Sequence, residues 1–435
     1  MTIELIILLM FGSLLLLLLL GVPIGFALGS VAVGAIYFQQ GSNALITIAY
    51  STFALMWQIL FMTVPLFVFM GAVLQRSGIA GGLYEAAYRW AGSTKGGLAL
   101  GTVIVGVFFA AMTGITGAST ITMGIIAIPS MLSRGYDKKL AVGCVAGSGS
   151  LAILIPPSVP MVLLALFTRQ SVGKMLMGGI LPGLLIAFLF VCYIMINGFL
   201  RPKTCPAHPQ GFTLKEKIVF SIGFILPLGL IGLVLGSMFF GVATPTEAAA
   251  LGALGTVGCC ILQKKFSWRL IREATLDTFM LTGVVMWIGF GAQCFSTTFT
   301  SIGGIDFISE LMLGLQVNRW LVLTIITLIL LVLGCFLDPT SIIMIAGPIS
   351  FSILIPLGFD PIWWGVVFVI LLECGYLTPP FGFNLFYLKS IVPPDITMGD
   401  IINSIWPWFF MLLLGVVILS IFPQVVLFIP NAMTR

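Results

Sequence analysis

The residues best suited to chemistry lie in two similar passages that are far apart in the chain. Residues 135–158 read GYDKKLAVGCVAGSGSLAILIPPS, and residues 358–381 read GFDPIWWGVVFVILLECGYLTPPF. In both, a Pro-Pro pair begins 19 positions after the aspartate. Proline lacks an N–H and disfavours helical backbone in the residue before it, so each pair interrupts a helix and frees carbonyl oxygens. Inside a membrane, such oxygens must face protein, water or an ion, which makes binding the expected chemistry.

The two passages form an internal repeat with an offset of 223 positions (360 minus 137), about half of the 435-residue chain. Apolar segments that are interrupted by Gly and Pro at corresponding places in two halves indicate the binding site of a secondary transporter. A pair of helix kinks without function is the alternative. The equal spacing in both copies argues against it.

The composition is that of a membrane protein. Hydrophobic residues make up 60% of the chain and charged residues only 8%, whereas soluble domains carry about 25% charged residues. The apolar tracts are too long and alternate too little for an outer-membrane barrel, so we predict an all-α polytopic membrane protein. The first twenty residues lack a basic start and a small-residue cleavage site. We therefore expect a retained membrane segment and not a signal peptide.

Catalytic and metal chemistry have few residues to build on. The eight cysteines form no CxxC motif, and we expect them to be buried small apolar residues. The single histidine, His208, lies in the loop 201–217. No P-loop motif is present, which argues against an ATPase. An integral membrane enzyme would need a convergent acid/base or metal set, so we predict that the chain is not an enzyme. We attribute the net charge of +5 to basic cytoplasmic loops.

The apolar tracts predict the helices that position the two passages. Tracts 98–133 and 320–357 are broken near the middle by TGITGAST and GCFLDPTS, and they predict two re-entrant hairpins. The interrupted helices follow at 140–168 and 361–388. Residues 5–38 form either two short spans or one bent helix. The remaining spans are predicted at 50–74, 175–200, 218–238, 242–263, 276–299 and 401–429.

The basic loops predict the topology. Loops 201–217 and 264–272 are basic and should face the cytoplasm. Counting spans from them places 134–139 in the cytoplasm and 358–361 in the periplasm. The two hairpins then enter from opposite sides, and the repeat is inverted.

Four further motifs are spread along the chain from about residue 60 to the C-terminus. They are GASTITMGIIAIPSMLSRGYDKKLAVGCVAGSGSLAILIPPSVPMV, GVATPTEAAALGALG, LDPTSIIMIAGPI, and LTPPFGFNLFYLKSI followed by DITMGDII. Together they resemble the large membrane subunit of the tripartite ATP-independent periplasmic (TRAP) transporters. The resemblance covers nearly the whole chain.

The resemblance implies a sodium-coupled secondary importer that works by an elevator mechanism in the bacterial inner membrane. It also implies a small four-helix membrane subunit and a periplasmic binding protein that delivers an organic anion, a carboxylate or a sulfonate. No four-helix segment precedes Met1, so we expect the small subunit to be a separate chain. The alternative is a stand-alone sodium/anion symporter of similar inverted-hairpin fold, which would transport without partners.

The resemblance further implies a transport domain that moves against a scaffold. Two amphipathic segments, 81–93 and 304–315, look like the arms that link the two. The predicted division is 1–75 scaffold, 76–96 arm, 97–170 first transport repeat, 171–273 scaffold, 274–318 linking span and second arm, 319–390 second transport repeat, and 391–435 C-terminal scaffold helix.

Two sodium sites and a substrate site are expected in the transport domain, since sodium needs several carbonyl or hydroxyl oxygens. The expected ligands of the first ion are Thr116, Ser119 and Thr120, facing Gly147, Ser148, Gly149 and Ser150. Those of the second ion are Asp338, Thr340 and Ser341, facing Gly375, Thr378 and Asn384. The substrate is expected beside the helix breaks at Pro156, Pro157, Ser158, Pro379 and Pro380. Half-helix N-termini there would present N–H groups to an anion. For each Ser or Thr, a hydrogen bond back to its own helix is the alternative.

Three acids in apolar sequence have open roles. Asp338 is a sodium ligand or the N-cap of a helix that begins at Pro339. Glu373 lies next to the second glycine break, and it could pair, protonate or coordinate. Glu247 follows Thr244 by three positions, which is the spacing of a capping box, with direct substrate contact as the alternative.

No basic residue lies in the predicted membrane interior, so the anion would be held by dipoles, hydroxyls and sodium. Arg169 and Lys174 fall on the outer side. We expect them to be solvated loop charges, with contact to the delivery protein as the alternative.

Overall fold

The computed structural model describes residues 2–91, 94–206, 213–307 and 318–433. Within these ranges all the regular secondary structure is helical, which confirms the all-α prediction. Among the described residues, five runs of helix are long and apolar enough to cross a membrane, so this is a multi-pass membrane protein. These five runs are Ile59–Arg76, Val172–Leu200, Pro245–Leu262, Trp268–Ser301 and Met398–Ile421.

The sequence allowed either two short spans or one bent helix over residues 5–38. The structure shows two helices with a turn at Gly21. The predicted single span 50–74 is wrong, since it is divided near Trp57 and Gln58. The backbone is extended at Gln58, with ψ 108°, and a 3-10 turn then leads directly into the next helix. The helices of this region are α1 (Ile3–Leu19), α2 (Ile24–Gln40), α3 (Leu45–Met56), α4 (Thr63–Arg76) and α5 (Ile79–Ala91), with 3-10 turns at Ser42–Ala44 and Ile59–Met62.

The first repeat forms a helical hairpin followed by an interrupted helix, as predicted. Gly114, at φ 62°, and Ile115 make the hairpin turn. The Asp137 carboxylate caps the following helix and accepts hydrogen bonds from the N–H groups of Lys139 and Leu140. The elements are α6 (Gly97–Thr113), α7 (Thr116–Leu132), α8 (Lys138–Ser150), a 3-10 turn (Leu151–Ile153) and α9 (Val159–Phe167).

The second repeat has the same layout in the same register. Asp360 caps its helix through the N–H groups of Ile362 and Trp363, as Asp137 does in the first repeat. The start of α17 follows that of α7 by 223 residues (339 minus 116), and the start of α18 follows that of α8 by the same number (361 minus 138). Both Pro-Pro bonds are cis. The elements are α16 (Arg319–Gly334), α17 (Pro339–Leu354), α18 (Pro361–Leu377) and α19 (Phe383–Lys389).

The remaining helices differ from prediction mainly at their ends. The predicted single span 401–429 is wrong, since it stops at Phe422 and a short helix starts after Pro423. Segment 81–93 lies largely within α5, whereas most of segment 304–315 lies outside the described residues. The elements are α10 (Val172–Gly178), α11 (Ile180–Leu200), α12 (Leu214–Phe239), α13 (Pro245–Leu262), α14 (Trp268–Ser301), α20 (Met398–Ile421) and α21 (Gln424–Ala432).

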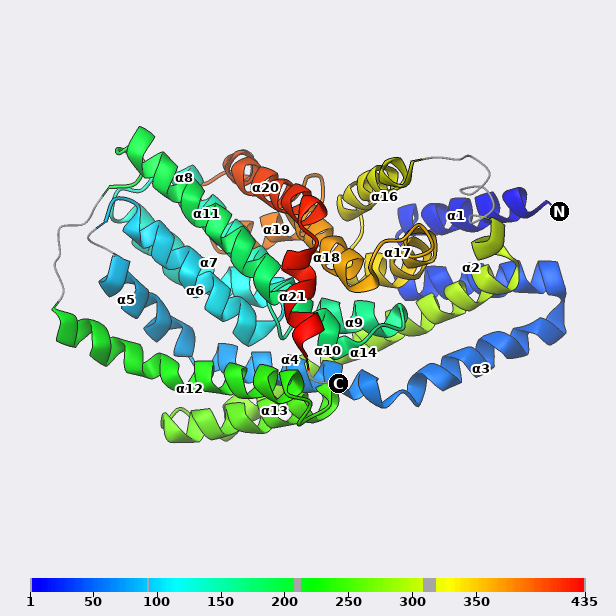
Figure 1. Cartoon of the computed structure of the whole chain (residues 1–435), viewed down its shortest axis with the longest axis horizontal. Helices are drawn as coiled ribbons and strands as arrows, with labels where there is room; N and C mark the ends of the chain where they lie inside the picture. Colours follow the sequence, from blue (N-terminus) through cyan, green and yellow to red (C-terminus); the bar gives the residue numbers. More distant parts are fainter. Residues whose placement is uncertain (1, 92–93, 207–212, 308–317, 434–435) are drawn as a thin grey trace.

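The molecule is elongated, and the two repeats meet near its middle (Figure 1). Helices α5 to α8 lie toward one end, whereas α1, α2, α3, α16 and α17 lie toward the other. Helix α18 lies between them and has apolar side chains on all its faces, as expected for a buried helix, with Glu373 as its one charged residue. Its residues Trp364 and Phe368 are among the largest fully buried side chains in the described chain.

Candidate functional site

The hydroxyl groups predicted for the first ion lie in the first turns of α7, directly after the hairpin turn. Thr116, Ser119 and Thr120 are all fully buried. The Oγ1 atom of Thr116 and the Oγ atom of Ser119 have no hydrogen-bond partner. A buried polar group without a partner costs about 1–3 kcal/mol. These two oxygens are therefore free to bind a cation.

Helix α8 contributes to this cluster mainly through Gly149. A methyl group on Gly149 would lie 2.2 Å from Thr120 Oγ1, so the two elements are in close contact there. Of the other residues predicted on this helix, Gly147 packs against Trp408 of α20, and Ser148 packs against Gly106 of α6.

Two of the predicted hydroxyls on α8 are already hydrogen-bonded within the helix. Ser148 Oγ donates to the Cys144 carbonyl at 2.7 Å, and Ser150 Oγ donates to the Gly147 carbonyl at 2.9 Å. For these residues the structure supports the back-bonding alternative.

Asn384 was predicted in the second group, and the structure places its side chain against the first cluster. Its Oδ1 accepts a hydrogen bond from Thr120 Oγ1 at 3.0 Å, and its Nδ2 donates to the Ala146 carbonyl at 3.2 Å. All three residues are fully buried. Because α19 follows the second break, this side chain brings the second repeat into the first cluster.

The first helix break is closed by the tip of its hairpin. A methyl group on Gly114 would lie 2.4 Å from the Pro157 carbonyl oxygen. The Val159 N–H donates to the Gly114 carbonyl at 3.4 Å, and Ser158 caps α9 by accepting from the Met161 N–H at 3.3 Å. Pro156, Pro157 and Ser158 are buried.

The second cluster begins with a helix cap. The Asp338 carboxylate accepts a hydrogen bond from the Ser341 N–H at 3.1 Å and another from the Ser341 hydroxyl. Asp338 is thus the N-cap of α17, with Pro339 at the first helical position. Asp338 and Thr340 are half-buried, and Ser341 is fully buried.

The second helix break is closely packed at Gly375 and exposed at Pro380. A methyl group on Gly375 would lie 2.7 Å from the Gly334 Cα, so here the backbones of α16 and α18 touch. Thr378 Oγ1 donates to the Cys374 carbonyl at 2.6 Å. Pro379 and Thr378 are half-buried, whereas Pro380 is exposed.

The structure also settles the position of the two other acids. Glu373 on α18 is fully buried, and neither carboxylate oxygen has a hydrogen-bond partner. Glu247 forms a capping box with Thr244, whose Oγ1 accepts from the Glu247 N–H at 3.4 Å while Glu247 Oε2 accepts from the Thr244 N–H at 2.8 Å.

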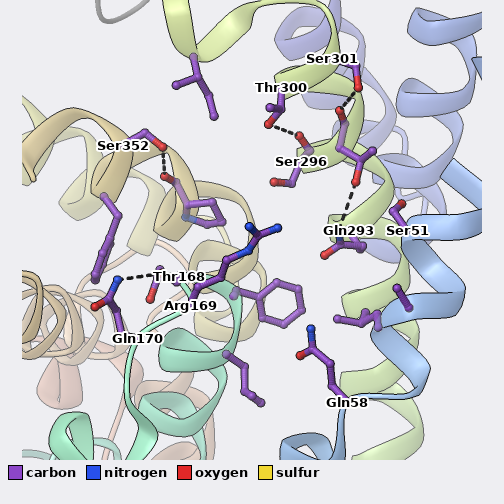
Figure 2. A pocket seen from close by; sticks show the side chains of 18 of the residues that line it. Ser51, Gln58, Thr168, Arg169, Gln170, Gln293, Ser296, Thr300, Ser301 and Ser352 are labelled. Carbon is purple, nitrogen blue, oxygen red and sulfur yellow. Dashed lines mark hydrogen bonds between the residues drawn. The ribbon is translucent and has the colours of Figure 1, made fainter. Parts of the chain in front are cut away.

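A polar cavity that the sequence reasoning missed lies where the C-terminal ends of α9 and α17 approach α3 and α14 (Figure 2). Its volume is about 710 Å³. The available signal was a polar stripe at helical spacing on α14, formed by Gln293, Ser296, Thr297, Thr300 and Ser301.

The comparisons with known proteins agree with the resemblance. The chain matches the family model of the DctM component of tripartite ATP-independent periplasmic transporters over residues 11–425. The C4-dicarboxylate TRAP transporter large permease protein DctM of Pseudomonas aeruginosa is 34% identical over 375 residues, which are 85% of this chain and 86% of the relative. The isethionate TRAP transporter permease protein DctMQ of Oleidesulfovibrio alaskensis is 31% identical over 383 residues, 88% of this chain and 60% of the relative.

A solved structure shares the fold. The structure of the YdaH transporter of Alcanivorax borkumensis superposes with a TM-score of 0.64 at 16% identity, covering 96% of this chain and 98% of that one. The two relatives described above are named as transporter permeases and not as enzymes. This chain belongs to the DctM family, the large permease component of TRAP transporters.

Proposed function

We propose that this chain imports an organic anion together with sodium ions across the bacterial inner membrane. The ligand class is suggested by the names of two relatives, which specify a C4-dicarboxylate and isethionate. One is a dicarboxylate and the other a sulfonate, so both are small organic anions. We further propose that a small membrane subunit and a periplasmic binding protein take part, in keeping with the tripartite family and with the DctMQ name of one relative.

The observation that carries the sodium proposal is the unpartnered pair of hydroxyls in the first cluster. Thr116 and Ser119 are buried and lack protein partners, whereas Thr120 is held in place by Asn384. In the described residues no group of His, Cys, Asp and Glu could hold a metal ion. Neutral oxygens at helix ends instead suit a monovalent cation that is bound and released during each transport cycle.

The proposed mechanism is alternating access with the two hairpins re-entering the membrane. The four hairpin helices have 16 or 17 residues, which at about 1.5 Å per residue is about 25 Å and shorter than a hydrocarbon core of about 30 Å. Their turns would therefore lie inside the membrane, next to the helix breaks. There the N-termini of the half-helices would face the anion, while sodium reduces the repulsion between the anion and the helix carbonyls.

We further propose that the chain is divided into a moving transport domain and a scaffold. The packing of α20 favours one change to the division predicted from the sequence. Trp408 of α20 lies against α8, where methyl groups on Gly143 and Gly147 would come within 2.3 and 2.5 Å of its ring atoms. Helices α8 and α20 cannot slide past each other without first separating at this contact. We therefore place α20 with the moving unit, although the predicted boundary at 391 assigns it to the scaffold.

Uptake into proteoliposomes tests the proposal. The vesicles contain this chain with its small subunit, and succinate or isethionate is added outside with the loaded binding protein. We expect uptake that requires both an inward sodium gradient and the binding protein.

Two other results would redirect the proposal. Sodium-driven uptake by this chain alone would favour the stand-alone symporter. An uptake rate that is the same with and without the sodium gradient would contradict sodium coupling.

A further inference from the structure

The polar cavity described above is separate from both clusters at the helix breaks. Helix α9 runs from the first break at Ser158 to the cavity at Phe167, and α17 runs from Asp338 to the cavity at Ser352. At about 1.5 Å per residue, the rise to the nearest lining residue is roughly 12 Å along α9, from Ser158 to Leu166, and roughly 15 Å along α17, from Asp338 to Pro348. The opposite wall comes from α3 and α14. The cavity therefore lies at the far ends of the elements that form the proposed ion sites.

The lining of this cavity is mixed polar and apolar, and it carries one sign of charge. Hydroxyl and amide side chains make up about half of the lining residues, among them Gln58, Gln293, Ser296 and Ser352. Arg169 is the one charged side chain among the described lining residues, and no carboxylate accompanies it. No ion pair of Arg169 occurs in the described part of the chain. Within its described lining, the cavity thus offers several donors and one positive charge that has no ion-pair partner.

The guanidinium of Arg169 points into the cavity and is not used to close its own helix (Figure 2). The end of α9 is capped by main-chain hydrogen bonds, in which the N–H groups of Thr168 and Gln170 donate to the carbonyls of Leu164 and Ala165 at 2.9 and 2.8 Å. A cation at a helix C-terminus can serve the helix dipole. Because the Arg169 side chain is directed into the cavity, we expect it to interact with a molecule bound there.

We propose that this cavity is an outer binding site for a carboxylate or sulfonate anion, with Arg169 as its positively charged partner. The inference rests on the proposed function for the class of ligand. A guanidinium pairs with such groups through two parallel hydrogen bonds. The volume of about 710 Å³ lies within the range of small-molecule sites. The predicted topology puts Arg169 on the outer side, so the anion would wait here before it reaches the helix breaks.

Thiol labelling tests the electrostatics of the cavity without any need to know the natural substrate. A cysteine is introduced by Ser296→Cys, and its reaction rate is measured with the anionic sulfonatoethyl and the cationic trimethylammonioethyl methanethiosulfonates in membrane vesicles. The protein without the new cysteine gives the background from the native thiols. We expect the anionic reagent to be favoured, and Arg169→Gln to lower the ratio of anionic to cationic rates by at least about fivefold at low salt.

The matched control is Lys174→Gln, which removes a nearby exposed cation that does not line the cavity. It should leave the ratio unchanged within about twofold. Arg169→Lys should restore most of the ratio, because it restores the charge. If Arg169→Gln leaves the ratio unchanged, or if neither reagent reaches the cysteine, the proposal is wrong. Ser352→Cys repeats the measurement from the opposite wall if the first variant does not fold.

Uptake separates this inference from the proposed function. In proteoliposomes, Arg169→Gln should raise the KM for the loaded binding protein or its anion severalfold while the maximal rate stays within about twofold. Failure of sodium-driven uptake in the unmodified protein would overturn the proposed function and leave the labelling result standing. A changed KM without a changed labelling ratio would place Arg169 at the surface that meets the binding protein, and would overturn the anion site.

Discussion

The two hairpin-and-break units share their register but differ in how their polar groups are satisfied. In the first unit, Thr116 and Ser119 are buried without partners and the break is covered by Gly114. In the second, Asp338 and Ser341 bind each other, and the break is exposed at Pro380. A repeat therefore preserves the backbone layout without preserving the chemistry of the site. We expect the first unit to depend more strongly on a dehydrated ion than the second.

The largest effect is expected where the two walls of the first unit touch. In Gly149→Ala the new methyl group would lie 2.2 Å from Thr120 Oγ1, so Thr120 must turn away from Asn384. Overpacking of this kind costs about 1–3 kcal/mol. We expect sodium-dependent uptake to fall at least about tenfold. Gly258→Ala is the control, since no atom lies within 4 Å of its new methyl group. Equal uptake by both variants would show that the first unit is not a tight site.

Removing one hydroxyl from each unit compares them directly. Ser119 Oγ has no protein partner, whereas Thr378 Oγ1 already donates to a carbonyl. We expect Ser119→Ala to raise the sodium concentration for half-maximal uptake about fivefold and Thr378→Ala about twofold, with both proteins folded. The measurement is uptake against sodium concentration. A larger effect of Thr378→Ala would reverse the comparison, and no effect in either would refute the assignment of both clusters.

The Asn384 side chain, which links the two units, should contribute to the stability of the folded protein. Asn384→Leu leaves the Thr120 hydroxyl and the Ala146 carbonyl without their buried partner. We expect a cost of about 1–3 kcal/mol, seen as a fall of several degrees in the thermal unfolding of the purified protein. Asn403→Leu on the exposed side of α20 is the control. An unchanged melting temperature for Asn384→Leu would mean that the link is dispensable.

The smallest effect is expected at the exposed ion pair that joins the start of α8 to the turn before α20. The hydrogen bond from Lys138 holds the pKa of the Asp395 carboxyl below its usual range. A lowered pKa in the folded state stabilises the protein at pH values above the unfolded pKa, and this stabilisation is lost as the pH falls through the folded pKa. Because the pair is exposed, Asp395→Asn should shift the melting temperature by less than about 2 °C at neutral pH, and by less still in acid. A shift that grows on acidification would contradict this assignment.

Much of the fold was predictable because its signals are local. The interrupted helices were predicted from residues 140 and 361 and begin at Lys138 and Pro361, and the Pro-Pro pairs predicted that each helix is interrupted. The missed interruptions, at residues 57–58 and at Pro423, lie inside tracts that remain apolar on both sides. Hydropathy alone does not register such breaks.

The candidate site was predictable in its residue types and less so in its pairings. The hydroxyls of α7 were identified from their place after a glycine break. Asn384 was grouped with Thr378 because both belong to the second repeat, but it contacts Thr120 at a separation of 264 residues. Arg169 gave no sign of a cavity, because three of the helices that line it are distant in sequence.

By itself, the sequence determined membrane residence, the internal repeat and the places where helices must stop. These follow from side-chain hydropathy and from the missing N–H of proline, which act within a few residues. Only the tertiary structure decided which hydroxyls lack partners, which repeat supplies the partner of Thr120, and where a polar cavity remains. Those outcomes depend on the packing of segments hundreds of residues apart, and such packing leaves no local signal in the chain.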